Sequence, residues 1–245
     1  MNTVAVVLAS GSGERFGKTK TPKHLTPFLG VPCIVWTLDT IVRSKLFSTI
    51  VVVVSEKNMA ITKQTLDEYF VDKKTSIITT LGANDRAQSF DLGINCLKKL
   101  NFVDKSSIVA LFDANRPFVQ VTQLFELHEA MKTKACACPA RPLVNGVAFV
   151  DSGHIISVPK KSELMEFVTP EFLKLDQYLC NFDNLLDGHN CLVEFSLASG
   201  VKPYTIRATD INTKLTYPED RPFMEELARQ KELIPPVSSR RMHQI

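Results

Sequence analysis

The 245-residue sequence lacks any apolar run that approaches the roughly 18 residues needed to cross a bilayer. Its first residues also lack a basic stretch ahead of a signal-type apolar core, so we expect a cytoplasmic protein. Neither sign of charge dominates, because 29 Lys and Arg residues stand against 26 Asp and Glu residues. A net charge of +3 does not call for nucleic acid or a membrane surface as a partner.

The cysteines and histidines lack the spacing of a metal site. Cys136 and Cys138 are two residues apart, which suits one face of a strand rather than a C-x-x-C ligand pair. The five histidines form no ligand cluster. We therefore expect buried, reduced thiols and no zinc site.

Internal repeats, low-complexity tracts and a domain linker are also missing. With 44% hydrophobic and 22% charged residues, the composition suits one large globular domain. We expect that domain over residues 1–232, followed by a tail at 233–245.

The first half of the chain alternates apolar runs with helical patterns. Strands are predicted at 4–8, 50–54, 76–78, 108–112 and 135–138, and helices at 34–42, 59–70, 85–100 and 121–131. This alternation predicts an α/β fold, with a doubly wound, mostly parallel sheet covered by helices on both faces.

The pattern changes after residue 142. Apolar residues alternate with small or polar ones around Asp151-Ser152-Gly153, which predicts a β-hairpin. Helices are then predicted from Thr169-Pro170 to about 186, at 191–198 and at 218–231, with a strand at 204–206.

A glycine-rich loop follows the first predicted strand. Gly11 and Gly13 can bring backbone N–H groups close to a phosphate, and Arg15 and Lys23 add positive charge. The loop does not fit the P-loop, which needs four residues between its first Gly and Gly-Lys-Ser/Thr, whereas five follow Gly11. The dinucleotide motif G-x-G-x-x-G also fails, which disfavours an NAD-dependent reductase. A polar turn that binds nothing is the alternative.

Two further motifs follow strands of the same predicted sheet. The segment 85–89 comes after the third strand, and 113–116 comes after the fourth. Ligands of such sheets lie outside the carboxyl ends of the strands. We therefore expect the glycine-rich loop and these two motifs to form one site.

Together these motifs resemble a known superfamily, the nucleotide-diphospho-sugar transferases. The pattern A-x-G-x-G-x-R at 9–15 followed by Pro22-Lys23 is similar to the signature of sugar-nucleotide pyrophosphorylases and related nucleotidyltransferases. Segments 85–89 and 112–117 resemble its CTP-dependent branch, which includes methylerythritol-phosphate and ribitol-phosphate cytidylyltransferases. The resemblance runs from about residue 3 to about 229 and implies a Rossmann-like nucleotidyltransferase fold.

The resemblance implies that CMP passes from CTP to a polyol phosphate and pyrophosphate is released. It assigns catalysis to Arg15, Lys23 and Lys214, the last within a Thr-Lys-Leu-Thr motif. Asp113 ends an apolar strand, and a carboxylate there is expected to hold Mg²⁺, which prefers hard oxygen ligands and shares phosphates with them; a carboxylate that caps the next turn is the alternative. The implied nucleotide-binding residues are Ala9, Ser10, Gly11, Gly13, Ala83, Asn84, Ser89 and Arg116. Asp85 and Arg86 are expected to form an ion pair that organises their loop.

The acceptor half matches the family less well. Arg141-Pro142-Leu143-Val144 stands where the methylerythritol enzymes have Arg-Asp-Thr. By resemblance, Lys161 replaces the arm arginine that reaches the neighbouring subunit's acceptor phosphate, and Asp210 is an acceptor-side carboxylate. The arm, at about 141–162, implies a homodimer; a hairpin folded onto its own domain is the alternative.

Three readings of function remain open. Family weight favours 2-C-methyl-D-erythritol 4-phosphate as acceptor, and the departures favour ribitol 5-phosphate or another polyol phosphate used for cell-envelope polymers. A non-catalytic, nucleotide-binding paralogue is the third.

Overall fold

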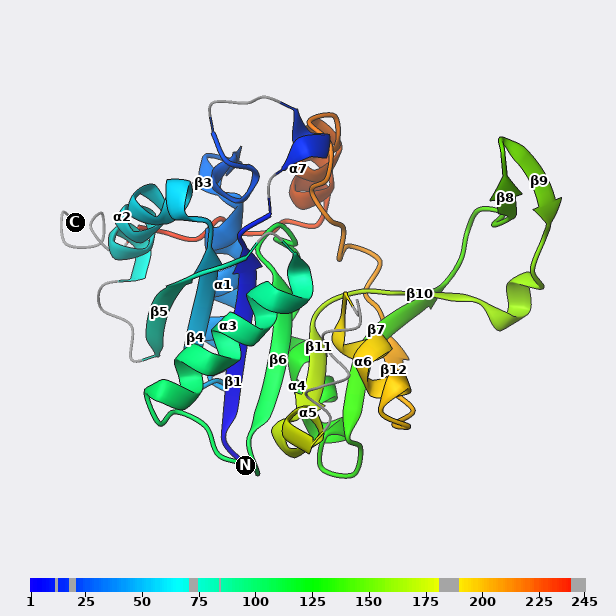
Figure 1. The fold of residues 1–245 in the computed structure, drawn as a ribbon. Helices are drawn as coiled ribbons and strands as arrows, with labels where there is room; N and C mark the ends of the chain where they lie inside the picture. The colour runs from blue at the N-terminus through cyan, green and yellow to red at the C-terminus, as the bar shows by residue number, and fades with distance from the viewer. Residues whose placement is uncertain (12, 18–20, 71–74, 84, 181–189, 239–245) are drawn as a thin grey trace.

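The computed structural model describes residues 1–11, 13–17, 21–70, 75–83, 85–180 and 190–238 (Figure 1). Its main sheet has the strand order β10-β7-β11-β6-β1-β4-β5, with β12 beside β7. The strands are β1 (Thr3–Ala9), β4 (Thr49–Val54), β5 (Ser76–Leu81), β6 (Ile108–Asp113), β7 (Cys136–Pro142), β10 (Met165–Phe167), β11 (Glu171–Lys174) and β12 (Tyr204–Arg207). No helix of the described residues is long and apolar enough to span a membrane.

Helices cover both faces of this sheet. The helices are α1 (Cys33–Ser44), α2 (Met59–Phe70), α3 (Arg86–Lys99), α4 (Val121–Ala130), α5 (Leu175–Cys180), α6 (Leu192–Ala198) and α7 (Asp220–Gln230). Residues of α1, α2, α4 and α7 pack in one apolar cluster, and residues of α3, α5 and α6 in the other. Figure 1 shows α3 across one face with α1 behind the sheet. The predicted α/β fold is thus confirmed, with a mixed, largely parallel sheet.

The buried runs of β1, β4 and β6 explain why these strands occupy the centre. Every residue of β4 and β6 is buried, so apolar side chains are needed on both faces. β1 pairs in parallel with both of them, and β4 pairs in parallel with β5. The carboxyl ends of β1, β5 and β6 therefore meet at one edge, where the three motifs lie.

One helix prediction is wrong. Thr169-Pro170 leads into strand β11, which pairs antiparallel with both β6 and β7. Phe172 and Leu173 are fully buried and belong to the two opposite apolar clusters, so each sheet face receives one of them. Helix begins only at Leu175, and residues 181–189 lie outside the described part.

Short elements complete the chain. They are η1 (Glu14–Phe16), η2 (Lys23–Leu25), β2 (Pro27–Phe28), β3 (Val31–Pro32), η3 (Glu56–Asn58) and η4 (Lys161–Glu163). Past the last helix, the described part of the tail packs on the body: Ser238 is buried, and its hydroxyl donates to the carbonyl of Glu68 at 3.1 Å.

The predicted hairpin is β8 (Phe149–Asp151) paired with β9 (His154–Ser157). Ser152 and Gly153 form its turn with φ of 47° and 83°, the left-handed values that a two-residue hairpin turn requires. Figure 1 shows the hairpin projecting away from the body. We call residues 141–162 the arm.

Candidate active site

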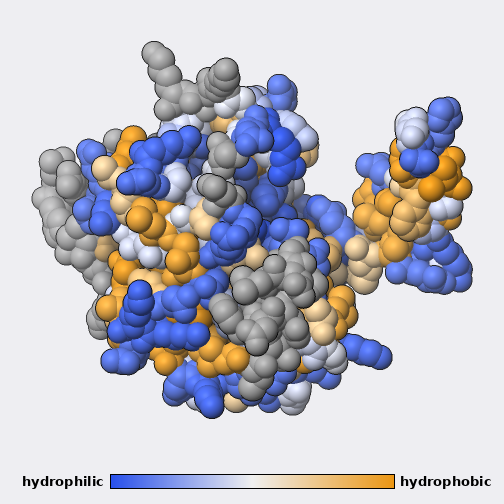
Figure 2. Space-filling model, in the orientation of Figure 1, coloured by the Kyte–Doolittle hydropathy of each residue, from blue (hydrophilic) through white to orange (hydrophobic). Residues whose placement is uncertain are grey.

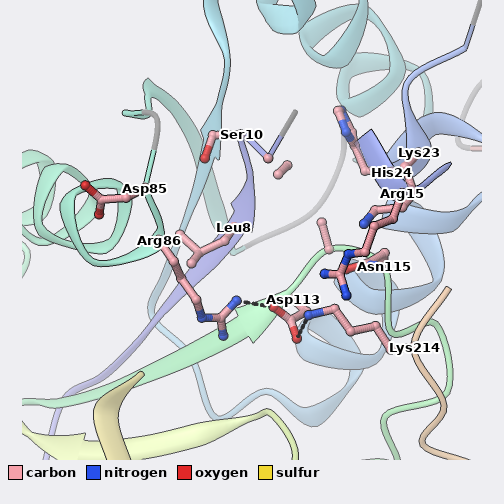
Figure 3. Close-up of a pocket in the computed structure, with 13 residues that line it drawn as sticks. Leu8, Ser10, Arg15, Lys23, His24, Asp85, Arg86, Asp113, Asn115 and Lys214 are labelled. Atoms are coloured by element: carbon pink, nitrogen blue, oxygen red, sulfur yellow. Dashed lines mark hydrogen bonds and ion pairs between the residues drawn. The ribbon is translucent and has the colours of Figure 1, made fainter. Parts of the chain in front are cut away.

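A cavity of about 300 Å³ opens at the carboxyl ends of β1 and β6 (Figure 3). It is lined by Leu8, Ala9, Ser10, Gly11, Arg15, Lys23, His24, Asp85, Arg86, Asp113, Ala114, Asn115 and Lys214. These residues come from the three predicted motifs and from the loop ahead of α7. The structure thus brings together Arg15, Lys23, Asp113 and Lys214, although Lys214 is far from the others in sequence.

The wall near β1 is held by a serine pair. The hydroxyls of Ser10 and Ser89 lie 2.9 Å apart, and the Ser89 hydroxyl also receives the N–H of Ala83 at 3.0 Å. A Cβ at Gly82 would fall 2.5 Å from Cβ of Ser10, so only glycine allows this approach. The loops after β1 and β5 are therefore packed directly against each other.

The predicted nucleotide residues fall into two groups. Ala9, Ser10 and Gly11 line the cavity, whereas Ala83 and Ser89 support it through the hydrogen bonds just described. Gly13 has a φ of 72° and begins the turn η1 that presents Arg15. Asn84 lies outside the described residues. Their nucleotide-binding roles stay predictions.

Positive side chains face the cavity from two sides. Figure 3 shows Arg15 and Lys23 on one side and Lys214 beside Asp113. Burial and the charges of Lys214 and Arg15 lower the pKa of Lys23. Burial also lowers the pKa of Lys214, although Asp113 opposes this effect. Mutual repulsion of this kind is relieved when a polyanion enters.

Asp113 is the buried centre of the site. Its Oδ2 accepts from Lys214 at 3.0 Å, from Arg116 Nε at 3.2 Å and from the Thr169 hydroxyl at 3.2 Å. Its Oδ1 accepts from Arg86. Burial by itself would raise the pKa of the Asp113 carboxyl, but the charges of Arg86, Lys214 and Arg116 hold it well below its usual range.

Arg116 belongs to a ring of hydrogen bonds around Asp113. Besides Asp113, its guanidinium reaches the carbonyl of Asn212 at 3.0 Å. The buried Asn212 side-chain amide donates to the carbonyl of Thr169 at 2.9 Å. The hydroxyl of Thr169 in turn donates to Oδ2 of Asp113, which closes the ring. The ring fixes the loop that carries Lys214. Arg116 is not among the residues that line the cavity, and its role at the nucleotide stays a prediction.

Asp85 and Arg86 do not form the expected pair. The Asp85 carboxylate caps α3 by accepting from the N–H of Gln88 at 2.7 Å. Arg86 pairs with Asp113, and its Nη2 lies 3.8 Å from Oε1 of Glu171. Burial raises the pKa of Glu171, although Arg86 and the N–H of Val193 favour its carboxylate form.

Sequence reasoning gave no role to several residues that the structure places at the site, among them His24, Thr169, Glu171 and Asn212. His24 lines the cavity and bonds through Nε2 to the Thr62 hydroxyl at 3.0 Å, which ties the turn of Lys23 to α2. Glu171, on β11, lies beside Arg86, and Asn212, in the loop before Lys214, accepts from Arg116 through its carbonyl. Of these residues, only His24 could have been suspected from the sequence, because it directly follows Lys23 of the Pro-Lys motif.

The two acceptor candidates lie outside the cavity of this chain. Lys161 is on the arm, where its Nζ donates to the carbonyl of Val144 at 2.6 Å. Asp210 is an exposed turn residue after β12. The structure leaves both assignments as predictions.

The described residues contain no group of three or more His, Cys, Asp and Glu that could hold a metal unaided. Asp85 and Asp113 are the carboxylates among the residues that line the cavity, and Asp113 is the one in contact with Lys214. Mg²⁺ commonly binds one or two carboxylates together with substrate phosphates. The donor set fits Mg²⁺ only if phosphates supply the remaining ligands.

The sequence matches the family model described as "IspD: 2-C-methyl-D-erythritol 4-phosphate cytidylyltransferase" over residues 3–229. The chain belongs to this family. It is therefore an IspD-family cytidylyltransferase. Membership in this family gives CTP and a sugar or polyol phosphate as its substrates.

Relatives of this IspD-family chain carry two different substrate names. A 2-C-methyl-D-erythritol 4-phosphate cytidylyltransferase of Caldicellulosiruptor bescii is 28% identical over 94% of this chain and 99% of its own length. A ribitol-5-phosphate cytidylyltransferase of Lactiplantibacillus plantarum is 22% identical over 88% of this chain and 94% of its own length.

The fold is also that of solved relatives. A 4-diphosphocytidyl-2C-methyl-D-erythritol synthase structure from Anaerococcus prevotii superposes with a TM-score of 0.73 at 20% identity, over 93% of this chain and 98% of that one.

Proposed function

We propose that this protein transfers CMP from CTP to a small polyol phosphate, with 2-C-methyl-D-erythritol 4-phosphate as the first candidate acceptor. The observation that carries the proposal is the shared cavity, where Arg15, Lys23 and Lys214 face Asp113. Two anions must meet during this reaction, so several fixed positive charges are required.

The chemistry follows from that arrangement. The glycine-rich loop at 9–11 frames the pyrimidine and ribose with backbone groups. Arg15 and Lys23 bind the triphosphate, and Lys214 stabilises charge at the α-phosphate. An oxygen of the acceptor's phosphomonoester attacks the α-phosphorus, the bond to the β-phosphate breaks, and pyrophosphate leaves. Positioning and charge stabilisation supply the rate enhancement, and no covalent enzyme intermediate forms.

Asp113 is the residue that would hold Mg²⁺. Bound Mg²⁺ would neutralise phosphate charge and orient the oxygens that it contacts. The chain's own part is to keep Asp113 ionised and in place, which Arg86, Arg116 and Thr169 support through their hydrogen bonds.

Ribitol 5-phosphate is the second candidate acceptor. Relatives with that name support it. At the base of the arm, Arg141 is held by Glu166, with Nε and Oε2 2.9 Å apart. A guanidinium neutralised in this way binds an acceptor phosphate less strongly. The departure from the methylerythritol pattern on this side of the site is Pro142-Leu143, which follows Arg141 where Asp-Thr is expected.

We also propose that the arm joins two copies of the chain. Phe149, Val150, Ile155 and Ile156 are all more than 60% exposed. An apolar hairpin of this kind needs a covering surface. Lys161, at the end of the arm, then contributes to the acceptor site of the second copy.

A pyrophosphate-release assay tests the function. Each of the four nucleoside triphosphates is offered with Mg²⁺ and a panel containing 2-C-methyl-D-erythritol 4-phosphate, ribitol 5-phosphate and erythritol 4-phosphate. We expect release with CTP and one of the first two acceptors. Tight CTP binding without release from any acceptor would instead support a non-catalytic nucleotide-binding protein.

A further inference from the structure

Arg86 lies between two buried carboxylates. On one side its guanidinium contacts Oδ1 of Asp113, and on the other side its Nη2 is 3.8 Å from Oε1 of Glu171. Both acidic side chains are almost inaccessible, with residue exposures of 4% for Asp113 and 1% for Glu171. The same cation can therefore be shared between two acceptors without leaving the site.

The two carboxylates differ in how many of their hydrogen-bond acceptor positions are occupied. Asp113 accepts from Arg86, Arg116, Lys214 and Thr169, and a carboxylate offers about four lone-pair positions. Oε2 of Glu171 accepts from the N–H of Val193 at 3.0 Å, which fixes the side chain, while its Oε1 is beyond hydrogen-bond distance of Arg86. Glu171 thus has acceptor capacity left, whereas Asp113 has almost none.

A divalent cation at Asp113 faces an electrostatic obstacle. Three positive side chains, Arg86, Arg116 and Lys214, already contact this carboxylate. Nucleotide phosphates can attract Lys214, which lines the cavity, and Arg116 is held in the ring with Asn212. Arg86 is then the remaining cation that occupies Oδ1 of Asp113.

We propose that Glu171 is a positioning residue that receives Arg86 when metal and nucleotide load, and so releases Oδ1 of Asp113. This inference rests on the proposed metal role of Asp113. The distance from Arg86 Nη2 to Glu171 Oε1 has to shorten from 3.8 Å to hydrogen-bond length, a rotamer-scale change within a side chain that is about one quarter exposed. Glu171 was placed in no role by its sequence pattern, because it stands in a segment that reads as helix.

The test measures Mn²⁺ binding in the presence of CTP and without acceptor, by titration calorimetry or by the loss of the free-ion EPR signal. Glu171→Gln keeps the shape and the hydrogen bond from Val193 but removes the charge that holds Arg86. We expect its Mn²⁺ dissociation constant to rise about tenfold or more, since residues behind a metal ligand commonly have effects of that size.

A double-mutant cycle separates this role from general electrostatics. In an Arg86→Gln background there is no guanidinium to move, so the Glu171→Gln effect on Mn²⁺ should largely vanish. An equal loss of Mn²⁺ affinity in both backgrounds would overturn the proposal, because it would mean that Glu171 acts only through its own charge.

A second measurement does not depend on any variant. In a crystal structure of the wild-type protein with CTP and Mg²⁺, we expect Arg86 in hydrogen-bond contact with Glu171 and detached from Oδ1 of Asp113. Arg86 still on Asp113 would overturn the proposal.

Asp113→Asn separates the proposed metal role of Asp113 from the proposed positioning role of Glu171. If Asp113→Asn leaves Mn²⁺ affinity unchanged, the proposed metal role of Asp113 fails. If Asp113→Asn weakens Mn²⁺ binding and Glu171→Gln does not, only the role of Glu171 fails.

Discussion

At the scale of single residues, the site depends on charges that are partly buried and face one another. Lys23 and Lys214 come from segments far apart in the chain, and the charge of Lys214 adds to burial in lowering the pKa of Lys23. Binding of a polyanion relieves this repulsion, which makes binding more favourable. The sequence indicated both lysines through their motifs, but it gave no sign that Glu171 and Asn212 hold the groups around them.

Lys23→Met should reduce turnover by about 100-fold or more, because it removes one charge from the phosphate site while keeping the aliphatic stem. The fold should survive, since among the described residues no ion pair of Lys23 holds two elements together. Steady-state kinetics with CTP would be compared with Lys57→Met, a matched change at an exposed lysine. Activity of Lys23→Met near that of the control would remove Lys23 from catalysis.

His24 should make stability depend on pH. Burial and the charge of Lys23 lower its pKa to about 4, whereas an unfolded histidine titrates near 6.5. Between these values the unfolded chain binds more protons, so stability falls as pH falls. The loss by pH 5 is about 2 kcal/mol.

Urea unfolding at pH 8 and pH 5 would measure this loss. Glutamine can keep the hydrogen bond to Thr62 without titrating, so His24→Gln is the matched control. Wild type should lose about 2 kcal/mol more than His24→Gln between the two pH values. Equal losses would show that another group is responsible.

At the scale of elements, the strands that are buried on both faces were predictable, and the antiparallel strand was not. β1, β4 and β6 are unbroken apolar runs bounded by polar loops. β11 has four residues and is held by pairing with residues of β6 and β7 that lie more than thirty positions earlier in the chain. Its conformation is set by these distant partners rather than by local periodicity.

The close packing of α3 on the sheet gives a test at this scale. A Cβ at Gly93 would lie 2.7 Å from Cγ1 of Val6, a stiff buried side chain of β1. Gly93→Ala should therefore destabilise the protein by about 1–3 kcal/mol, although alanine normally favours a helix.

Gly146→Ala, on the arm, is the control, since nothing lies within 4 Å of its added Cβ. Thermal unfolding would be measured for both variants. A Gly93→Ala protein at least as stable as the control would show that α3 can shift away from β1 at little cost.

At the scale of the whole molecule, the chain consists of a compact body and an arm that leaves it. Figure 2 shows apolar residues gathered on the projecting hairpin. The sequence predicted the hairpin from its alternation and its turn. In the dimer proposed above, the surface that covers the hairpin belongs to the second copy, so no pattern within one chain describes the contact.

Ile155→Asp should convert the protein from dimer to monomer in light scattering coupled to size exclusion. Ile155 is 69% exposed, so the substitution removes nothing from the core and the unfolding midpoint of the body should change little. A buried aspartate at a dimer interface, in contrast, carries a large desolvation penalty. Ile61→Asp is the matched control, because Ile61 is also exposed, at 48%, but lies on α2. A dimer that persists in Ile155→Asp, or a wild-type protein that is monomeric at micromolar concentration, would contradict assembly through the arm.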